Sequence, residues 1–327
     1  YLGMKFDFTA AGIVTVDMSE YVKAVIADMP SDMIGKAATP AAQHLFDVRD
    51  NSIPVEKEKA DAFHKIVMQL QYLSQRARPD IRTAVSFLCK RVSAPDLDDY
   101  KKLTRVMRYL QSTIYLKLTL ESDGTGIIRW WVDASYAVHP DMKGHTGGTL
   151  SMGKGCIYSV ATGQKLVARS STEAELIGVH DLMPQIVWTS YFLQAQGQIV
   201  TDNILYQDNM SSILLEKNGR SSSTKRTRHI NIRYFFVKDR VASGEVRIEH
   251  CPTLEMLADY FTKPLQGALF YKMRDLIMNI DPTSEYHSSA HRSVLSNEEK
   301  NPEVPPDGKE PGCITKIGFT ATNQNNR

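Results

Sequence analysis

The feature that most constrains the fold is the stretch of residues 130–137, which reads Trp-Trp-Val-Asp-Ala-Ser-Tyr-Ala. The apolar residues Ile127, Ile128, Trp130 and Val132 have the types and the length of a buried central strand. At the end of this run stands one carboxylate, Asp133. The stretch therefore predicts a strand in the middle of a sheet that delivers an acidic group at its end.

Three later segments each place another carboxylate near the edge of an expected element. Glu175 lies at the start of a helix, Asp208 follows a strand, and Asp259 lies inside a helix. Hard divalent cations such as Mg²⁺ take oxygen ligands and leave positions to water or to substrate phosphate. Four acids from four elements are therefore what a site for such cations needs.

Glu175 also has a purely structural interpretation. Thr172 and Glu175 are three residues apart and fit a capping box, in which the Glu side chain reaches back to the start of its own helix. Glu173 fits no such pattern and is the weaker candidate for chemistry. The sequence leaves cap and ligand open for Glu175.

The other acids have structural alternatives as well. Asp133 could form a turn or cap a helix, and Asp208 stands where Asp caps a helix that follows a strand. Asp259 is expected within a helix, where Asp has poor intrinsic propensity. A residue placed against local preference needs another reason, and metal coordination is one.

The order of expected elements predicts an α/β layer with a mixed sheet. Residues 1–16 read as a hairpin, and residues 31–57 as a loop. The remaining elements follow from hydrophobic spacing: helices at 19–29, 58–73, 79–92 and 97–112, strands at 127–133, 147–152, 156–160 and 165–169, a helix at 172–196, a strand at 204–207, short helices to 241, a strand at 246–250 and a helix at 254–265.

Composition adds few constraints. The formal net charge is only +2, so a nucleic-acid role has to come from local patches. The four cysteines are widely separated, which indicates neither a zinc site nor a disulfide framework and makes a reducing, intracellular setting the default. No apolar run approaches the length of a membrane span, so no membrane partner is expected.

Two basic clusters are candidates for phosphate contact. The first cluster lies on the helix expected at 97–112 and consists of Lys101, Lys102, Arg105 and Arg108. A solvated face is the favoured interpretation of this cluster, and phosphate contact is the alternative. The second cluster consists of Lys225, Arg226, Arg228, His229 and Arg233. It follows a run of Ser and Thr residues, which suits contact with a nucleic-acid backbone.

Five segments in this order resemble the RNase H domain of copia-type LTR retrotransposon Pol polyproteins. They are Trp-Val-Asp-Ala-Ser-Tyr at 131–136, Ser-Ser-Thr-Glu-Ala-Glu-Leu at 170–176, Tyr-Gln-Asp-Asn-Met-Ser at 206–211, Thr-Lys-Arg-Thr-Arg-His-Ile-Asn-Ile-Arg-Tyr at 224–234, and Leu-Ala-Asp-Tyr-Phe-Thr-Lys-Pro-Leu at 257–265. Arg78-Pro79-Asp80-Ile81 and Arg108-Tyr109-Leu110 resemble the end of the reverse transcriptase in the same polyproteins.

The resemblance implies a division into three parts. Residues 1–120 would be the end of the reverse transcriptase palm with a helical thumb or connection-like region. Residues 121–280 would be an RNase H-like domain with a mixed five-stranded sheet flanked by helices. Residues 281–327, rich in Ser, Glu, Asn and Pro, are expected to be a disordered tail. The start at Tyr1, in mid-pattern, suggests a piece of a longer protein.

The resemblance also implies an activity. Asp133, Glu175, Asp208 and Asp259 would be the catalytic acids and would hold two Mg²⁺ ions, with Mn²⁺ as an alternative, on either side of the scissile phosphate. The reaction would be endonucleolytic hydrolysis of the RNA strand of an RNA–DNA hybrid. Its partners would be the hybrid and the remainder of the polyprotein, in a cytoplasmic particle or the nucleus.

Two other functions remain open from the sequence. The chain could be a non-catalytic nucleic-acid-binding remnant of such a polyprotein, inactive as a fragment. An integrase-like transferase with three acids is weakened by the fourth acid and by the absence of zinc-ligand pairs. The Tyr-Val-Asp-Asp-like hairpin of the polymerase is nowhere in the sequence, so reverse transcription by this chain alone is not expected.

Overall fold

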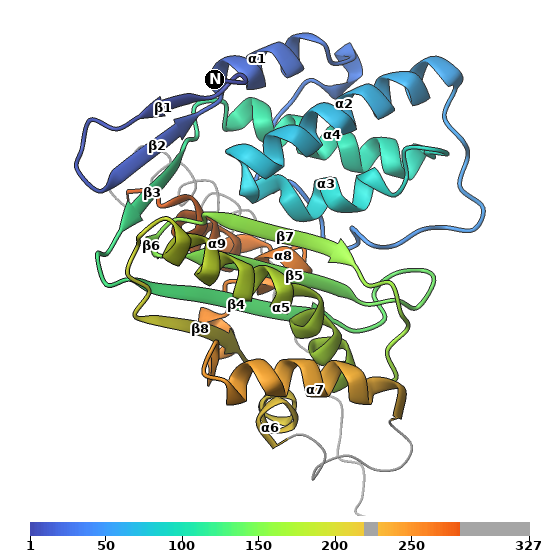
Figure 1. The fold of residues 1–327 in the computed structure, drawn as a ribbon. Helices are drawn as coiled ribbons and strands as arrows, with labels where there is room; N and C mark the ends of the chain where they lie inside the picture. The colour runs from blue at the N-terminus through green and yellow to red at the C-terminus, as the bar shows by residue number, and fades with distance from the viewer. Residues whose placement is uncertain (219–227, 282–327) are drawn as a thin grey trace, which may run out of the picture.

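The computed structural model describes residues 1–218 and 228–281 of the chain. In this part a helical body built from the first 112 residues lies against a mixed β-sheet with its own covering helices (Figure 1). The sequence expectation of an α/β architecture is confirmed.

A small antiparallel sheet stands at one end of the helical body. Its first two strands, β1 (Lys5–Asp7) and β2 (Ile13–Asp17), form the hairpin that the alternating residues predict. β2 pairs in turn with β3 (Leu118–Ser122), and β3 pairs with β6 (Gly153–Lys154). The strands that precede and follow the helical segment in the sequence are thereby joined to β6, which lies between two strands of the larger sheet in the sequence.

The helical body has apolar residues at helical spacing that meet in one core. Its elements are α1 (Ser19–Ala27), a 3₁₀ turn (Ser31–Met33), α2 (Lys57–Arg76), a second 3₁₀ turn (Pro79–Ile81), α3 (Arg82–Cys89) and α4 (Leu97–Ser112). Phe63 and Leu70 of α2, Leu88 of α3 and Leu103 of α4 are fully buried. Asp96 and Asp99 form a capping box at the start of α4.

Within the described residues the second sheet has five strands in the order β7-β5-β4-β8-β9. Their bounds are β4 (Ile127–Ser135), β5 (His145–Ser151), β7 (Tyr158–Gly163), β8 (Asp202–Gln207) and β9 (Arg247–His250). β4, β5 and β7 pair antiparallel, whereas β4, β8 and β9 pair in parallel. The central strand is therefore the one that the apolar run at 127–133 predicts, and it extends two residues beyond Asp133.

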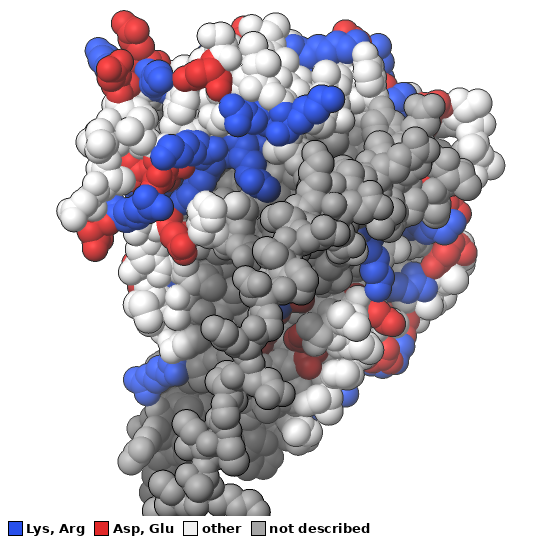
Figure 2. All heavy atoms as spheres, turned by 180° about the vertical axis from the view of Figure 1, so that it is seen from behind, with Lys and Arg blue, Asp and Glu red and all other residues white. Residues whose placement is uncertain are grey.

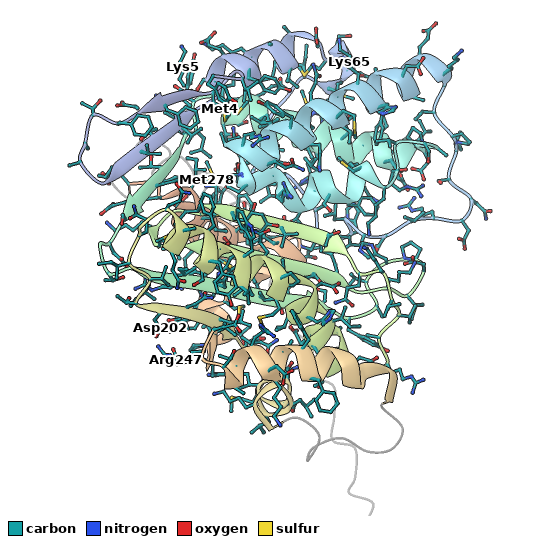
Figure 3. The ribbon with its side chains drawn as sticks, in the orientation of Figure 1. Met4, Lys5, Lys65, Asp202, Arg247 and Met278 are labelled. Atoms are coloured by element: carbon teal, nitrogen blue, oxygen red, sulfur yellow. The ribbon has the colours of Figure 1, made fainter. Side chains whose placement is uncertain are left out.

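Helices cover both faces of this sheet (Figure 1). α5 (Ser171–Ala195) packs on β4, and α6 (Met210–Asn218) and α7 (Arg228–Ala242) lie beside it. α8 (Asp259–Thr262) packs on β4 and β5, and α9 (Gly267–Met278) follows it. An ion pair of 2.6 Å between Arg247 and Asp202 joins β9 to β8 at the sheet edge (Figure 3).

One buried cluster extends across both halves of the sequence. It joins side chains of α2 and α4, such as Leu70 and Tyr109, with Tyr260 and Phe270 of the last two helices. Met4 and Met278, near the two ends of the described chain, both belong to it (Figure 3). The division near residue 120 stays a prediction, and the tail expected at 281–327 lies, apart from Asp281, outside the described residues.

Two expected elements differ in the structure. Residues 165–169 do not form a strand; Leu166 and Val167 are exposed, and the segment leads from the sheet into the cap of α5. The helix expected at 254–265 is a 3₁₀ turn (Thr253–Glu255) followed by the four-residue α8. Pro264 lies just beyond α8 and cannot continue a helix, because it has no backbone N–H.

Candidate active site

The two parallel strands at the centre of the sheet place two of the acids side by side. Trp131 of β4 lies opposite Tyr206 of β8. Continuing this register by two residues brings Asp133 next to Asp208, at the carboxyl end of β8. Asp208 is not the cap of the following helix, because the side chain of Asn209 accepts the hydrogen bond from the backbone of Ser212 at 3.1 Å. The Asp208 carboxylate is thereby left available, and it accepts a hydrogen bond from Thr253.

Asp259 reaches the same place because α8 approaches the sheet closely. Gly147 of β5 pairs with Asp133, and a Cβ atom at Gly147 would lie 2.7 Å from Thr262 and 2.8 Å from the carbonyl of Ala258. The missing side chain therefore makes room for α8. Asp259 is the first residue of this helix, where an acid is favoured, and the expectation that it opposes local preference inside a long helix is wrong.

The start of α5 decides the part that Glu175 plays. Ser170 is the N-cap and accepts a hydrogen bond from the backbone of Glu173, whose carboxylate accepts one from the backbone of Arg169. The alternative in which Thr172 and Glu175 form a capping box is therefore wrong, because the cap lies two residues earlier. The expectation that Glu173 fits no capping pattern is wrong as well. Glu175, one turn into α5, is buried and points to Asp133 and Asp208, whose charges act on it.

Three of the four acids form a compact cluster. One carboxylate oxygen from each of Asp133, Asp208 and Asp259 lies within 4.8 Å of the others. Burial and the nearby charge of Asp133 raise the pKa of Asp259 to about 7, although Lys263 opposes this shift. Burial, followed by the charge and hydrogen bonding of Asp133, holds the pKa of Glu175 well above its usual range. Like charges in a dry site repel one another, and a proton or a cation has to compensate them.

Two residues that the sequence analysis did not single out also belong to the site. The Thr262 hydroxyl donates a hydrogen bond to Asp133. The Lys263 ammonium lies 2.7 Å from Asp259 and 3.7 Å from Asp133. Burial lowers the pKa of Lys263, but the charges of Asp133 and Asp259 outweigh it and raise the pKa above its ordinary value. The spacing of four between Asp259 and Lys263 on a helix is the signal in the sequence that could have identified this pair.

The residues present fit a divalent cation. All the ligand atoms are carboxylate oxygens, which suits Mg²⁺ or Mn²⁺ better than Zn²⁺. One carboxylate oxygen of Glu175 is buried without a hydrogen-bond partner among the described residues, and such an atom needs a cation or a proton. Lys263 already places one positive charge between two of the acids.

The second basic cluster is only partly described. Lys225 and Arg226 lie outside the described residues, and Arg228, His229 and Arg233 belong to the first half of α7. Their contact with nucleic acid stays a prediction. Among the described helices, none is both long enough and apolar enough to cross a bilayer.

The fold and the comparisons with known proteins define the class of this chain. Counted from β4, the strand order 3-2-1-4-5 with an antiparallel first hairpin and two parallel strands is an RNase H-like sheet. No family model matches the sequence. The chain is 34% identical over 210 residues to the retrovirus-related Pol polyprotein from transposon RE2 of Arabidopsis thaliana, which is 64% of this chain and 14% of that protein.

A second relative covers more of the chain. The retrovirus-related Pol polyprotein from transposon TNT 1-94 of Nicotiana tabacum is 27% identical over 268 residues, which is 80% of this chain and 20% of that protein. The relatives found are copia-type retrotransposon Pol polyproteins, and they match 64–80% of this chain. The chain spans a seventh to a fifth of the length of these two relatives. A solved foamy viral protease–reverse transcriptase in complex with double-stranded DNA has a TM-score of 0.41 and 10% identity, covering 75% of this chain and 38% of that one.

Proposed function

We propose that the chain is an RNase H that hydrolyses, with Mg²⁺ or Mn²⁺, the RNA strand of RNA–DNA hybrids endonucleolytically. The observation that carries this proposal is the meeting of four carboxylates from four elements at one edge of the central sheet. Lys263 is the one cation paired with these acids among the described residues, so a single positive charge faces several carboxylates. Similarity to retrotransposon Pol polyproteins supports the same interpretation of the site.

The side chains would divide the work as follows. Asp133, Asp208 and Asp259 would hold the divalent ions, and Glu175 would complete the set from α5. Bound ions of this kind neutralise charge at the scissile phosphate and supply a water-derived nucleophile. Thr262 fixes the orientation of Asp133, and Lys263 neutralises Asp133 and Asp259 while no divalent ion is bound.

The substrate would be recognised away from the acids. RNA differs from DNA by its 2′-hydroxyl groups, which line a wide and shallow minor groove in the hybrid. The basic residues Lys225, Arg226, Arg228, His229 and Arg233 are proposed to hold the phosphates of the substrate. We expect the chain to act together with the remainder of a Pol polyprotein, inside the cell in a cytoplasmic particle or the nucleus.

A cleavage assay on the purified chain tests this function. The substrate is an RNA–DNA hybrid with a labelled RNA strand, with double-stranded DNA and double-stranded RNA as comparisons, in Mg²⁺, in Mn²⁺ and in EDTA. We expect internal cuts in the RNA of the hybrid alone, and none in EDTA. Asp133→Asn should lower the rate by roughly 100-fold or more, since it removes the central ligand.

Asp202→Asn is the matched control. Asp202 is the first residue of β8, and Asp208 directly follows the last one. The carboxylate of Asp202 pairs with Arg247 at the sheet edge instead of facing the cluster. This variant should retain the activity. Cleavage that persists in Asp133→Asn would point to a contaminant or another site, and hybrid binding without cleavage in the unchanged chain would favour the non-catalytic remnant.

A further inference from the structure

A second site of unassigned function lies in the helical body. The loop at residues 36–49 and the helix α4 enclose a pocket of about 430 Å³. Six of the side chains that line it are cationic: Lys36, Arg49, Lys101, Lys102, Arg105 and Arg108. Two are acidic, Asp47 and Asp98, and none of the four acids of the candidate active site belongs to the lining. Lys and Arg side chains gather in a band over the upper part of the rear face (Figure 2).

Four of the six cations in this pocket have no direct ion-pair partner among the described residues, although nearby carboxylates, Asp47 and Asp96, Asp98 and Asp99 at the start of α4, act on Lys102. Asp98 pairs with Arg49 at 3.2 Å and with Lys101 at 3.4 Å. Within the described part of the chain, no carboxylate forms an ion pair with Lys36, Lys102, Arg105 or Arg108. A concave surface with such an excess of one sign concentrates the field and attracts counter-ions of the other sign.

The structure holds these cations in place before any ligand arrives. Arg105 donates hydrogen bonds to the carbonyl and the hydroxyl of Thr39, at 3.1 and 2.8 Å. Lys102 donates to the carbonyl of Asp47 and lies 4.5 Å from the ring centroid of Phe87. Burial lowers the pKa of both Lys102 and Arg105. Partly dry cations with fixed positions gain more from an anion than mobile, hydrated ones do.

Arg108 supplies an independent observation. Its Nε atom is buried and has no hydrogen-bond partner among the described residues, although the guanidinium also donates to the carbonyl of Asp32 at 3.4 Å. The side chain is pressed against Gly35, where an added Cβ would lie 2.9 Å from Nε. The loop therefore packs tightly against Arg108, although one N–H group of this arginine lacks a hydrogen-bond acceptor among the described residues.

The loop also gives the pocket an apolar lining. This lining consists of small or aliphatic side chains: Ala37, Ala38, Pro40, Ala41, Ala42 and Leu45. The volume lies in the range of small-molecule sites, about 300–1,000 Å³, and is too small to admit a nucleic-acid duplex. A ligand that matches both kinds of lining carries several negative charges and also a flat, weakly polar group.

We propose that this pocket binds a phosphorylated nucleotide, with the phosphates among Lys36, Lys102, Arg105 and Arg108 and the nucleoside over the alanine-rich loop. A nucleotide with its phosphates can come from two sources, a free nucleoside triphosphate or the 5′-terminal nucleotide of a nucleic-acid strand. The site does not depend on the proposed nuclease activity, because no acid of the cluster contributes to it.

Calorimetric titration of the full chain in EDTA tests the proposal, because EDTA keeps divalent ions away from the acid cluster. The probes are ATP, inorganic triphosphate, and an oligodeoxynucleotide with and without a 5′ phosphate. The variants are Lys36→Gln, whose parent side chain is exposed, and the double variant Lys36→Gln with Lys102→Gln, in which an uncharged amide replaces the second ammonium group. The control is Lys57→Gln, an exposed lysine at the start of α2 outside the pocket.

We expect ATP to bind several-fold more tightly than inorganic triphosphate. Lys36→Gln should weaken ATP binding measurably, and the double variant should weaken it about tenfold or more, a change of about 1.4 kcal/mol. Lys57→Gln should bind like the unchanged chain. Competition with ATP by the 5′-phosphorylated strand but not by its unphosphorylated form would identify the strand end as a source, and absence of competition would identify the free nucleotide.

Three results would overturn the proposal. Equal binding of ATP and inorganic triphosphate would show that the apolar lining contributes nothing. Equal binding of ATP to the pocket variants and to Lys57→Gln would place the nucleotide elsewhere. Equal binding of the two oligodeoxynucleotides that is lost in the pocket variants and is unaffected by ATP would make the surface a contact for a nucleic-acid backbone instead of a nucleotide pocket.

Discussion

At the level of single residues, an acid can face the cluster when a neighbouring residue caps the helix in its place. Asn209 caps α6 and Ser170 with Glu173 caps α5, so Asp208 and Glu175 remain free to face Asp133. Thr262 then adds a hydrogen bond that orients Asp133 from the opposite side. The acids are available for chemistry because adjacent residues meet the structural needs of the helices.

Replacing Thr262 by Val should weaken metal binding. The substitution keeps the shape of a fully buried side chain and removes the hydrogen bond to Asp133. Losing an interaction that orients a metal ligand typically costs about 10–100-fold in affinity or activity. Titration with Mn²⁺ should show a weaker apparent affinity, and the cleavage rate at saturating metal should recover in part. Thr201→Val, on the loop before β8, is the control and should leave the Mn²⁺ affinity and the cleavage rate unchanged. An unaltered Mn²⁺ affinity in Thr262→Val would contradict the role of the Thr262 hydroxyl.

Glu216 should make stability depend on pH. Burial raises its pKa to about 8 in the folded chain from an ordinary value of 4.5, and Ser212 donates a hydrogen bond to it. Below about pH 4.5 both the folded and the unfolded states are protonated at this group. Between pH 4.5 and 8 the unfolded state loses this proton and the folded state keeps it, so stability falls as pH rises, by up to about 1.4 kcal/mol per unit.

Glu216→Gln should remove this contribution. We expect the variant and the unchanged chain to have similar free energies of unfolding near pH 5, and the variant to be more stable at pH 8 by about 1 kcal/mol or more. Urea unfolding at several pH values measures the difference, which cancels the contributions of the other acids. Parallel pH profiles for the two proteins would show that Glu216 titrates normally.

At the scale of elements, close approach and capping bring the acids together. Gly147 lets α8 come near β5, and the cap at Ser170 starts α5 one turn before Glu175. The two parallel strands β4 and β8 end at the same edge, which brings Asp133 and Asp208 together. The sequence analysis expected all of these elements except the short form of α8.

The position of the α5 cap can be tested by two neighbouring substitutions. Ser170→Ala should lower the free energy of unfolding by about 1 kcal/mol, because it removes the side-chain acceptor for the backbone of Glu173. Thr172→Ala removes the capping side chain of the alternative that the sequence left open, and it should change stability by less. Urea unfolding compares the two variants, and a larger effect at Thr172 would restore the capping box of that alternative.

On the scale of the whole molecule, a buried polar network fastens the last helices to the helical body. Arg78 and Asp80 form a fully buried ion pair of 2.7 Å, and Tyr109 donates to Asp80 at 2.8 Å. Tyr260, next to Asp259, donates to the carbonyl of Asp80 at 3.0 Å. The helical body therefore helps to position the segment that carries the fourth acid.

Breaking this network should be strongly destabilising. Asp80→Ala leaves the Arg78 charge buried without its partner, which typically costs about 3–5 kcal/mol. Glu121→Gln, which removes the exposed pair with Lys154, is the matched control and should cost less than about 1 kcal/mol. Guanidinium unfolding measures both, and an Asp80→Ala effect as small as that of the control would mean that the network is dispensable.

The sequence by itself determined where most helices and strands lie, because hydrophobic spacing of 3.6 or 2 residues is a local property. It also identified the four acids and the basic face of α4. It began α5 at Thr172 and found no capping pattern for Glu173, although Ser170 and Glu173 form the cap, and it expected a longer helix around Asp259. Local patterns of this kind cannot choose between two neighbouring registers.

Only the tertiary structure decided which groups meet. The contact between Lys263 and the acids, the hydrogen bond from Thr262 and the pocket between α4 and its loop all join groups whose partners are set by packing. Asp133 and Thr262 are 129 residues apart in the chain and adjacent in space. Such proximity depends on strand order and on the close approach that Gly147 allows, and neither is encoded in the residues immediately around either side chain.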